Sequence, residues 1–162
     1  MRWIWFDRFE EFETGKRAVA VKNVTLAEDH LHDHFPDYPV MPASLMIEGM
    51  AQTAGILVGQ ARNFEEKVIL AKVKLAEFDR LVRPGDTLRY VAEIEQISES
   101  AATTRGVVML EGEPIGRVDL VFSHIDQNMS GLEFPEHNFV FTDEFMRLFE
   151  SYRHNSPQGI KL

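Results

Sequence analysis

The chain has 162 residues, 44% of them hydrophobic, which is enough for one domain with a substantial core. Its formal net charge of −9 at pH 7 leaves no basic face for phosphates and argues against a nucleic-acid-binding protein. The absence of cysteine excludes disulfides, thiolate metal sites and cysteine nucleophiles. Charges interrupt the apolar N-terminus and no run is long enough to span a membrane, so we expect a cytoplasmic protein with no membrane association.

The first part of the chain is predicted to hold an aromatic segment, a strand and a stiff loop. Residues 3–12 place five aromatic rings among acids, as in a short strand or an irregular segment docked on the core. Residues 16–24 alternate in a way that predicts a strand with one face more buried than the other. The acidic residues 25–33 favour a loop or a short helical turn. Three prolines in residues 35–42 predict an extended loop.

A long helix is predicted to follow this loop. Pro42 suits the first helical turn, where a missing N–H costs nothing, so the helix is expected from Ala43. Apolar residues occupy nearly every side of it until about residues 59–63, which is typical of a helix buried inside a protein. Its glycines allow close approach of a neighbour: Gly49, Gly55 and Gly59.

The chain beyond residue 64 is predicted to be mostly strand. Turn residues separate four apolar or alternating segments: 68–78, 87–97, 101–110 and 115–125. We expect an α+β fold in which one antiparallel β-sheet curls around the buried helix.

A C-terminal extension is predicted after the last strand. Residues 126–141 look like a connector, and Thr142 is suited to cap a final helix that docks one apolar face. We therefore expect a domain at residues 1–126 and an extension at 127–162 whose extra helix packs on that domain.

Residues in the central stretch suggest general acid–base chemistry. An unpaired charge on Glu48 inside an apolar helix is costly, so this residue either pairs with another group or stays protonated as a general acid. Gln52 lies one turn further on the same face and can hydrogen-bond it. His34 carries an imidazole suited to accepting a proton near pH 7. The free N–H groups near Ala43 can hold an oxyanion. This set predicts proton abstraction beside a carbonyl, with loss of a β-hydroxyl as water.

The run HLHDHF at residues 30–35 offers a second interpretation. Some hydrolases hold two zinc ions in an H-x-H-x-D-H loop, and this run is one residue short of that spacing. Few later histidines remain as ligands: His124, His137 and His154. We therefore predict no metal and no cofactor.

The stretch HFPDYPVMPASLMIEGMAQ, residues 34–52, resembles the 3-hydroxyacyl-acyl-carrier-protein dehydratases of fatty acid biosynthesis, the FabZ and FabA families. Their pattern is roughly H-F-P-G-x-P-V-x-P-G-x-L followed by E-A-x-A-Q. It is matched at His34, Phe35, Pro36, Pro39, Val40, Pro42, Leu45, Glu48, Ala51 and Gln52. A weaker likeness runs from about residue 5 to 125 and leaves out the C-terminal segment.

The resemblance implies a hotdog fold, in which the antiparallel sheet wraps around a long central helix. It also implies a homodimer, which can assemble as a trimer of dimers, with each active site taking its histidine from one chain and its acid from the other. His34 would abstract the C2 proton of a 3-hydroxyacyl thioester, and Glu48 of the partner subunit would protonate the departing hydroxyl. Gln52 would orient that acid, and the N–H of Ala43 would bind the thioester carbonyl. The implied partner is acyl carrier protein bearing a 4′-phosphopantetheine-linked substrate.

Two residues depart from the family pattern, because Asp37 and Ala43 stand where it prefers glycine. An acidic carrier protein would also need a basic patch on this acidic chain, although the candidates are equally compatible with ordinary solvated charges. These candidates are Lys72, Lys74, Arg80 and Arg83.

Two other functions stay open on the sequence alone: a hotdog acyl-CoA hydratase or thioesterase, and a non-catalytic acyl-binding domain. The apolar stretch around the motif is predicted to line a substrate tunnel, for which a core role is the more frequent alternative. The tunnel candidates are Phe35, Val40, Met46 and Met50.

Overall fold

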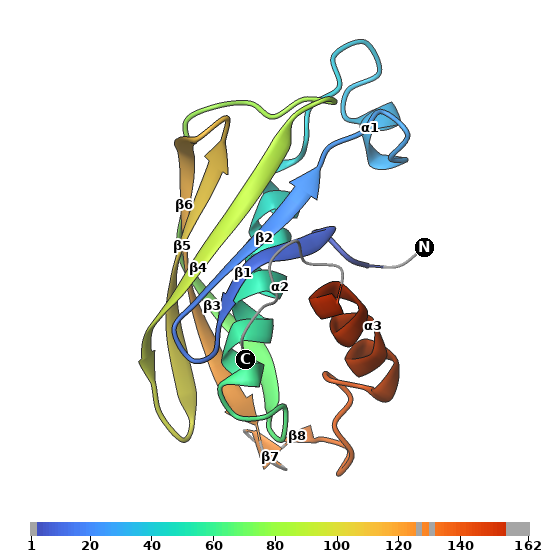
Figure 1. The fold of residues 1–162 in the computed structure, drawn as a ribbon. Helices are drawn as coiled ribbons and strands as arrows, with labels where there is room; N and C mark the ends of the chain where they lie inside the picture. Colours follow the sequence, from blue (N-terminus) through green and yellow to red (C-terminus); the bar gives the residue numbers. More distant parts are fainter. Residues whose placement is uncertain (1–2, 126–127, 130–131, 155–162) are drawn as a thin grey trace.

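The computed structural model describes residues 3–125, 128–129 and 132–154. A six-stranded antiparallel sheet wraps around helix α2, with helix α3 on the other side of α2 (Figure 1). The sheet has the order β1-β2-β4-β5-β6-β3. Its strands are β1 (Arg8–Glu13), β2 (Arg17–Asn23), β3 (Lys67–Phe78), β4 (Thr87–Ile97), β5 (Ala101–Leu110) and β6 (Glu113–Ile125). The other elements are α1 (His30–Asp33), α2 (Ala43–Gln60), the hairpin β7 (Asn128–Met129) and β8 (Leu132–Glu133), and α3 (Asp143–His154).

This arrangement confirms the predicted α+β architecture with an additional C-terminal helix. In the described part of the chain, no helix combines the length and the apolar character that crossing a bilayer requires.

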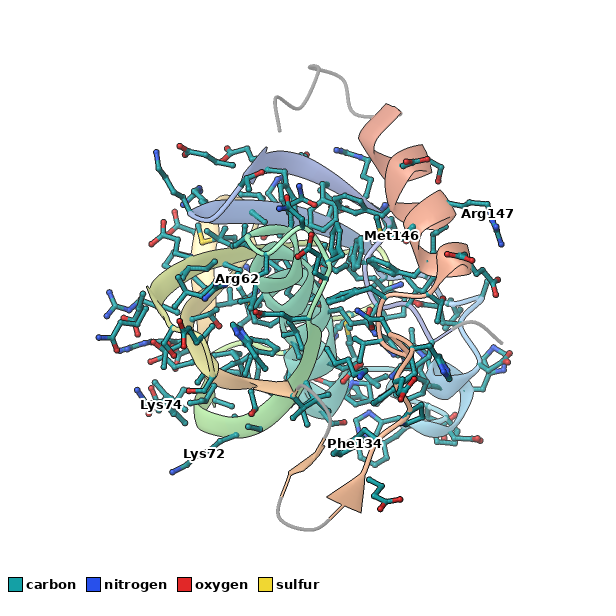
Figure 2. The ribbon with its side chains drawn as sticks, turned by 90° about the horizontal axis from the view of Figure 1, so that it is seen from below. Arg62, Lys72, Lys74, Phe134, Met146 and Arg147 are labelled. Carbon is teal, nitrogen blue, oxygen red and sulfur yellow. The ribbon has the colours of Figure 1, made fainter. Side chains whose placement is uncertain are left out.

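Strand β3 lies at one edge of the sheet, where, among the residues that the structure describes, it pairs with β6 alone. Its apolar side chains are unusually accessible, with Leu70 40% and Val73 39% exposed. Lys72 and Lys74 project from the same strand away from the body of the protein (Figure 2). An outer strand of twelve residues presents unpaired backbone groups to which another strand can hydrogen-bond.

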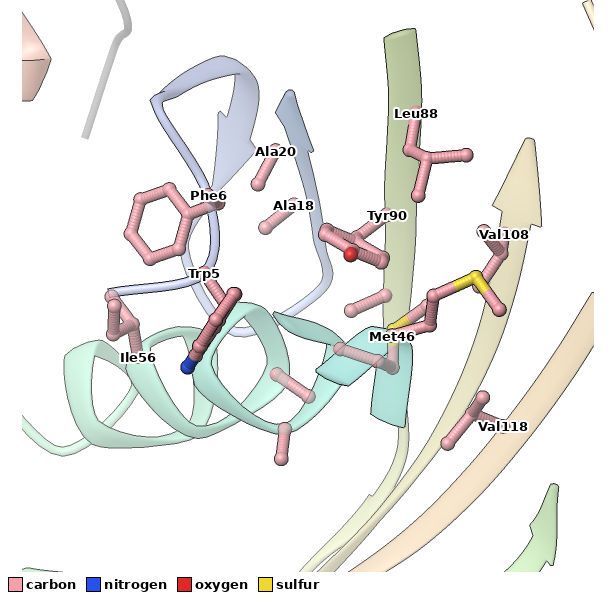
Figure 3. Close-up of a cluster of buried hydrophobic side chains, with 14 of the residues drawn as sticks. Trp5, Phe6, Ala18, Ala20, Met46, Ile56, Leu88, Tyr90, Val108 and Val118 are labelled. Carbon is pink, nitrogen blue, oxygen red and sulfur yellow. The ribbon is translucent and has the colours of Figure 1, made fainter. Parts of the chain in front are cut away.

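Helix α2 begins directly after Pro42 and ends at Gln60, as predicted. Its apolar residues fill the concave side of the sheet, where Met46 lies among Tyr90, Val108 and Val118 of three different strands (Figure 3). The ring of Tyr90 reaches the helix because Gly49 has no side chain, and a Cβ there would lie 2.5 Å from ring atoms. The burial of residues along α2 therefore matches a helix enclosed by the sheet.

The aromatic N-terminal segment docks its rings on the core, and only its second half is a strand. Trp5 and Phe6 precede β1 and are buried, whereas Phe9 and Phe12 point inward from β1 itself. A bulge between Phe9 and Glu11 interrupts the register with β2. The two expectations for this segment, irregular or strand, are each correct for one half of it.

The C-terminal extension packs on the domain through α3. The backbone N–H of Phe145 donates to Oγ1 of Thr142 at 3.2 Å, which is the predicted N-cap. Phe149 is buried, with its ring centroid 6.1 Å from that of Phe9 and 5.7 Å from that of Phe12. The helix thus covers the aromatic residues of β1.

Candidate active site

The loop that carries His34 is fixed by local hydrogen bonds. Nδ1 of His34 lies 2.8 Å from the carbonyl oxygen of Val40, and the N–H of Val40 donates to the carbonyl of His34 at 2.9 Å. Phe35 and Tyr38 exchange two further backbone hydrogen bonds. A carbonyl oxygen only accepts, so Nδ1 carries the hydrogen and the neutral ring keeps its lone pair on Nε2. The cis peptide bond of this segment joins His34 to Phe35, and its X–Pro bonds are trans.

Glu48 is half-buried, and two donors converge on one of its oxygens. Oε1 accepts hydrogen bonds from Nε1 of Trp3 at 3.0 Å and from Nε2 of Gln52 at 2.9 Å. The hydrogen bond that the spacing of Glu48 and Gln52 predicts is therefore present. Oε2 has no partner among the described residues. A proton on this carboxyl group is consequently favoured on Oε2, because Oε1 is already occupied as an acceptor.

Gln52 also ties the N-terminal segment to α2. Its Oε1 accepts from the backbone N–H of Trp5 at 2.9 Å, and its Nε2 donates to the carbonyl of Trp3 at 3.0 Å. Sequence reasoning placed the aromatic residues on the core but missed that Trp3 contacts Glu48. The one available clue was an indole N–H that needs an acceptor in a segment expected to dock.

A cavity of about 590 Å³ opens beside Glu48. Its wall contains Glu48 and Gln52 and is otherwise mainly apolar. The lining residues come from the N-terminal segment, α2, β3, β6 and the C-terminal extension, and His34 is not among them. His34 and Glu48 of one chain therefore do not line this cavity together.

The four predicted tunnel residues lie elsewhere. Val40, Met46 and Met50 are buried in the core, and Phe35 is 55% exposed on the loop with its ring stacked on that of His34. None of the four lines the cavity beside Glu48. Their contact with a substrate stays a prediction.

The first turn of α2 presents free N–H groups. The backbone N–H groups of Leu45 and Met46 donate to the carbonyl of Pro42, whereas those of Ala43 and Ser44 have no partner among the described residues. Ala43 is exposed and has a negative φ, so a residue with a Cβ is unstrained at this family glycine position. Asp37 is likewise exposed with a negative φ.

The histidines of the HLHDHF run point to separate partners. The ring of His30 packs against Trp5 at 5.2 Å, and burial holds the pKa of His30 below its ordinary value of 6.5. Nε2 of His32 lies 3.2 Å from the carbonyl oxygen of Leu26. Across the described ranges, no group of three or more His, Asp and Glu side chains is arranged to hold a metal ion.

The four candidate basic residues lie in different surroundings, and one of them contacts the loop that carries His34. Arg80 pairs with Glu111 at 2.9 Å, and Lys72 and Lys74 lie on the outer strand. Arg83 contacts the loop of His34, because its guanidinium stacks 4.2 Å from the ring centroid of Tyr38 and bonds the Tyr38 hydroxyl.

A family model and individual relatives of this chain point to the same protein family. The FabA-like domain matches residues 3–119. Two relatives, both described as 3-hydroxyacyl-[acyl-carrier-protein] dehydratase FabZ, come from Halalkalibacterium halodurans and Clostridium acetobutylicum. They are 41% identical over 118 residues and 40% identical over 117 residues. The matches cover 72% of this chain and 84% and 83% of the two relatives.

Solved structures share the fold at low sequence identity. The dehydratase heterocomplex ApeI:P from Xenorhabdus doucetiae has a TM-score of 0.62 at 14% identity, covering 75% of this chain and 83% of that chain. A conserved protein from Pseudomonas aeruginosa has a TM-score of 0.61 at 16% identity, covering 73% of this chain and 87% of that chain. These likenesses confirm the hotdog fold. Together with the match over residues 3–119, the sequence identities show that the chain belongs to the FabA-like domain family.

Proposed function

We propose that this protein is a hydro-lyase that dehydrates 3-hydroxyacyl thioesters on acyl carrier protein to trans-2-enoyl thioesters in fatty acid biosynthesis. The observation that carries the proposal is Glu48, which lies at a cavity with Oε1 held by two donors and Oε2 unengaged. Support comes from relatives that are 3-hydroxyacyl-[acyl-carrier-protein] dehydratases. In this proposal, residues 1–126 form the catalytic domain and residues 127–162 an extension.

His34 is the proposed base. The hydrogen bond of Nδ1 to Val40 leaves the Nε2 lone pair free to take the proton from C2 of the substrate. The C2–H electron pair then forms the double bond between C2 and C3. The protein thereby gains one proton on His34.

Glu48 is the proposed acid. As the bond between C3 and the hydroxyl oxygen breaks, Oε2 of Glu48 gives its proton to that oxygen, and water leaves. Trp3 and Gln52 hold Oε1 and so fix the direction of Oε2. Transfer of one proton from His34 to Glu48 through solvent then restores both groups.

The first turn of α2 is the proposed oxyanion-binding element. During removal of the C2 proton, negative charge develops on the thioester carbonyl oxygen. In this proposal the N–H of Ala43, at the positive end of the helix dipole and without a partner among the described residues, would stabilise such a charge.

A homodimer completes the proposed site. His34 does not line the cavity of Glu48 in its own chain, and the outer strand β3 offers an unpaired edge with exposed apolar side chains. A second copy paired through this edge would extend the sheet and supply the missing histidine. Each dimer would then hold two equivalent sites.

Mass spectrometry of a purified 3-hydroxyacyl-carrier protein and its CoA analogue tests the function. We expect loss of one water from the carrier-bound substrate, abolished in His34→Ala and Glu48→Gln and retained in the control His32→Ala. Release of the acyl group instead would identify a thioesterase. Folded protein that binds the substrates but leaves them unchanged would contradict the enzyme assignment.

A further inference from the structure

We propose that the C-terminal extension forms one wall of the acyl-chain site and limits the length of chain that the site accepts. This inference rests on the proposed function. It concerns a segment beyond residues 3–119, the part of the chain that the family domain covers.

The cavity changes in character along one face of α2. Glu48, Ala51, Gln52, Gly55 and Ile56 all line it and fall at helical spacing. Carboxyl and amide groups lie at the Glu48 end, and apolar groups lie at the Ile56 end. The eight steps from Glu48 to Ile56 correspond to about 12 Å along the helix axis. A substrate with its C3 hydroxyl at Glu48 would thus extend its acyl chain along α2 toward Ile56.

The extension supplies the apolar wall opposite this face. Six of its residues line the cavity: Thr142 and Glu144 are polar, and the other four are apolar, two of them from α3 and two from the segment just before it. The four apolar residues are Val140, Phe141, Phe145 and Leu148. A saturated acyl chain is the ligand that such a wall recognises, because it offers contact area without polar partners.

One side chain fixes the start of this wall to the domain. Nδ2 of Asn138 donates to the carbonyls of Phe64 and Glu66 at 3.1 and 3.2 Å. Its Oδ1 accepts from the N–H groups of Val140 and Phe141 at 3.0 and 2.9 Å. The amide therefore ties the extension to the loop that follows α2.

Close packing of an aromatic ring on α2 positions the rest of the wall. A Cβ at Gly59 would lie 2.4 Å from Cζ of Phe141, so this ring can approach the helix only because residue 59 is glycine. Phe64 joins the contact, with its ring centroid 4.9 Å from that of Phe141 and 5.9 Å from that of Phe145. The wall is therefore built against the same helix that carries Glu48.

Substitutions of opposite size test the inference. Leu148→Ala enlarges the cavity and Val140→Phe narrows it, whereas Met146→Ala changes the same helix at a residue outside the lining. We would measure kcat/KM for 3-hydroxybutyryl, 3-hydroxydecanoyl and 3-hydroxypalmitoyl carrier proteins. Leu148→Ala should raise the ratio of palmitoyl to butyryl turnover at least about tenfold, and Val140→Phe should lower it by a similar factor. The ratio for Met146→Ala should equal that of the wild type.

Equal ratios in all four proteins would overturn the inference while leaving the dehydratase function intact. A second measurement identifies the case in which the acyl site is real but the protein is not a dehydratase. Saturated decanoyl and palmitoyl carrier proteins lack the hydroxyl, so their binding reports the acyl site without any reaction. If these bind with the predicted dependence on chain length and size of residues 140 and 148, but no substrate loses water, the wall stands and the proposed function fails.

Discussion

The indole N–H of Trp3 donates a hydrogen bond of 3.0 Å to Oε1 of Glu48, joining residues 45 positions apart in the sequence. Trp3→Phe retains the aromatic ring and removes this donor. We expect kcat to fall about tenfold because Oε2 loses its fixed direction toward the hydroxyl. KM and the melting temperature should stay near their wild-type values. A rise in KM at constant kcat would instead assign Trp3 to substrate binding and would contradict a positioning role.

The separation of His34 from the cavity of Glu48 predicts complementation between inactive variants. His34→Ala and Glu48→Gln proteins are each expected to be inactive. When equal amounts are unfolded together and refolded, half of the dimers should contain one chain of each kind, with one intact site. We therefore expect about a quarter of the wild-type activity in the mixture.

Refolding each variant alone provides the control for this experiment. An inactive mixture that contains mixed dimers by native mass spectrometry would show that His34 and Glu48 of one chain act together.

The contact of Gly59 with Phe141 predicts strong coupling between the two positions. Gly59→Ala should lower the free energy of unfolding by about 1–3 kcal/mol, because the new methyl group displaces the Phe141 ring. In a Phe141→Ala background the same change should cost less, since only Cδ1 of Phe64, 3.0 Å from the new Cβ, still has to shift and alanine is the better helix former. Urea unfolding of the four proteins measures this difference. Additive free energies would contradict the contact.

The burial of His30 predicts a dependence of stability on pH. Its folded pKa lies below the ordinary value of 6.5, chiefly through desolvation. As the pH falls below about 6.5 the unfolded chain binds a proton more readily than the folded one, so the free energy of unfolding decreases. The carboxyl groups add their own effect at lower pH, as with Glu10, whose pKa the Arg89 hydrogen bond lowers.

Urea unfolding between pH 7 and pH 5.5 measures this dependence. His30→Phe keeps a ring against Trp5 and should flatten the slope, whereas His32→Phe should retain it. An identical slope for wild type and His30→Phe would disprove the assignment.

Much of the fold could be predicted because local rules agree with the tertiary structure. Pro42 and the apolar run predicted the start and the burial of α2, and alternation predicted 87–97 and 101–110 with the bounds that β4 and β5 have. The fixed spacing from His34 to Gln52 identified the candidate site residues. The hydrogen bond between Glu48 and Gln52 follows from their separation of one helical turn.

What could not be predicted depends on contacts between distant segments. α2 is apolar on most sides, so its sequence does not reveal which side faces the sheet and which faces a cavity. The sheet packs on one side, where the Tyr90 ring meets Gly49, and the extension packs on another, where the Phe141 ring meets Gly59. Met46 and Met50 lie in the core, while Ala51 and Ile56 line the cavity. The position of Trp3 beside Glu48 is set by the same long-range packing.

The chain contains two tryptophans, and both lie in the N-terminal segment that Gln52 holds. Trp3 is 61% exposed at the cavity and bonded to Glu48, and its ring meets that of buried Trp5 edge-on at 5.3 Å. One of the two indoles therefore contacts the proposed acid directly, and the other contacts that first indole. Intrinsic fluorescence is thus a label-free optical probe of ligand arrival at Glu48, and it needs no engineered chromophore.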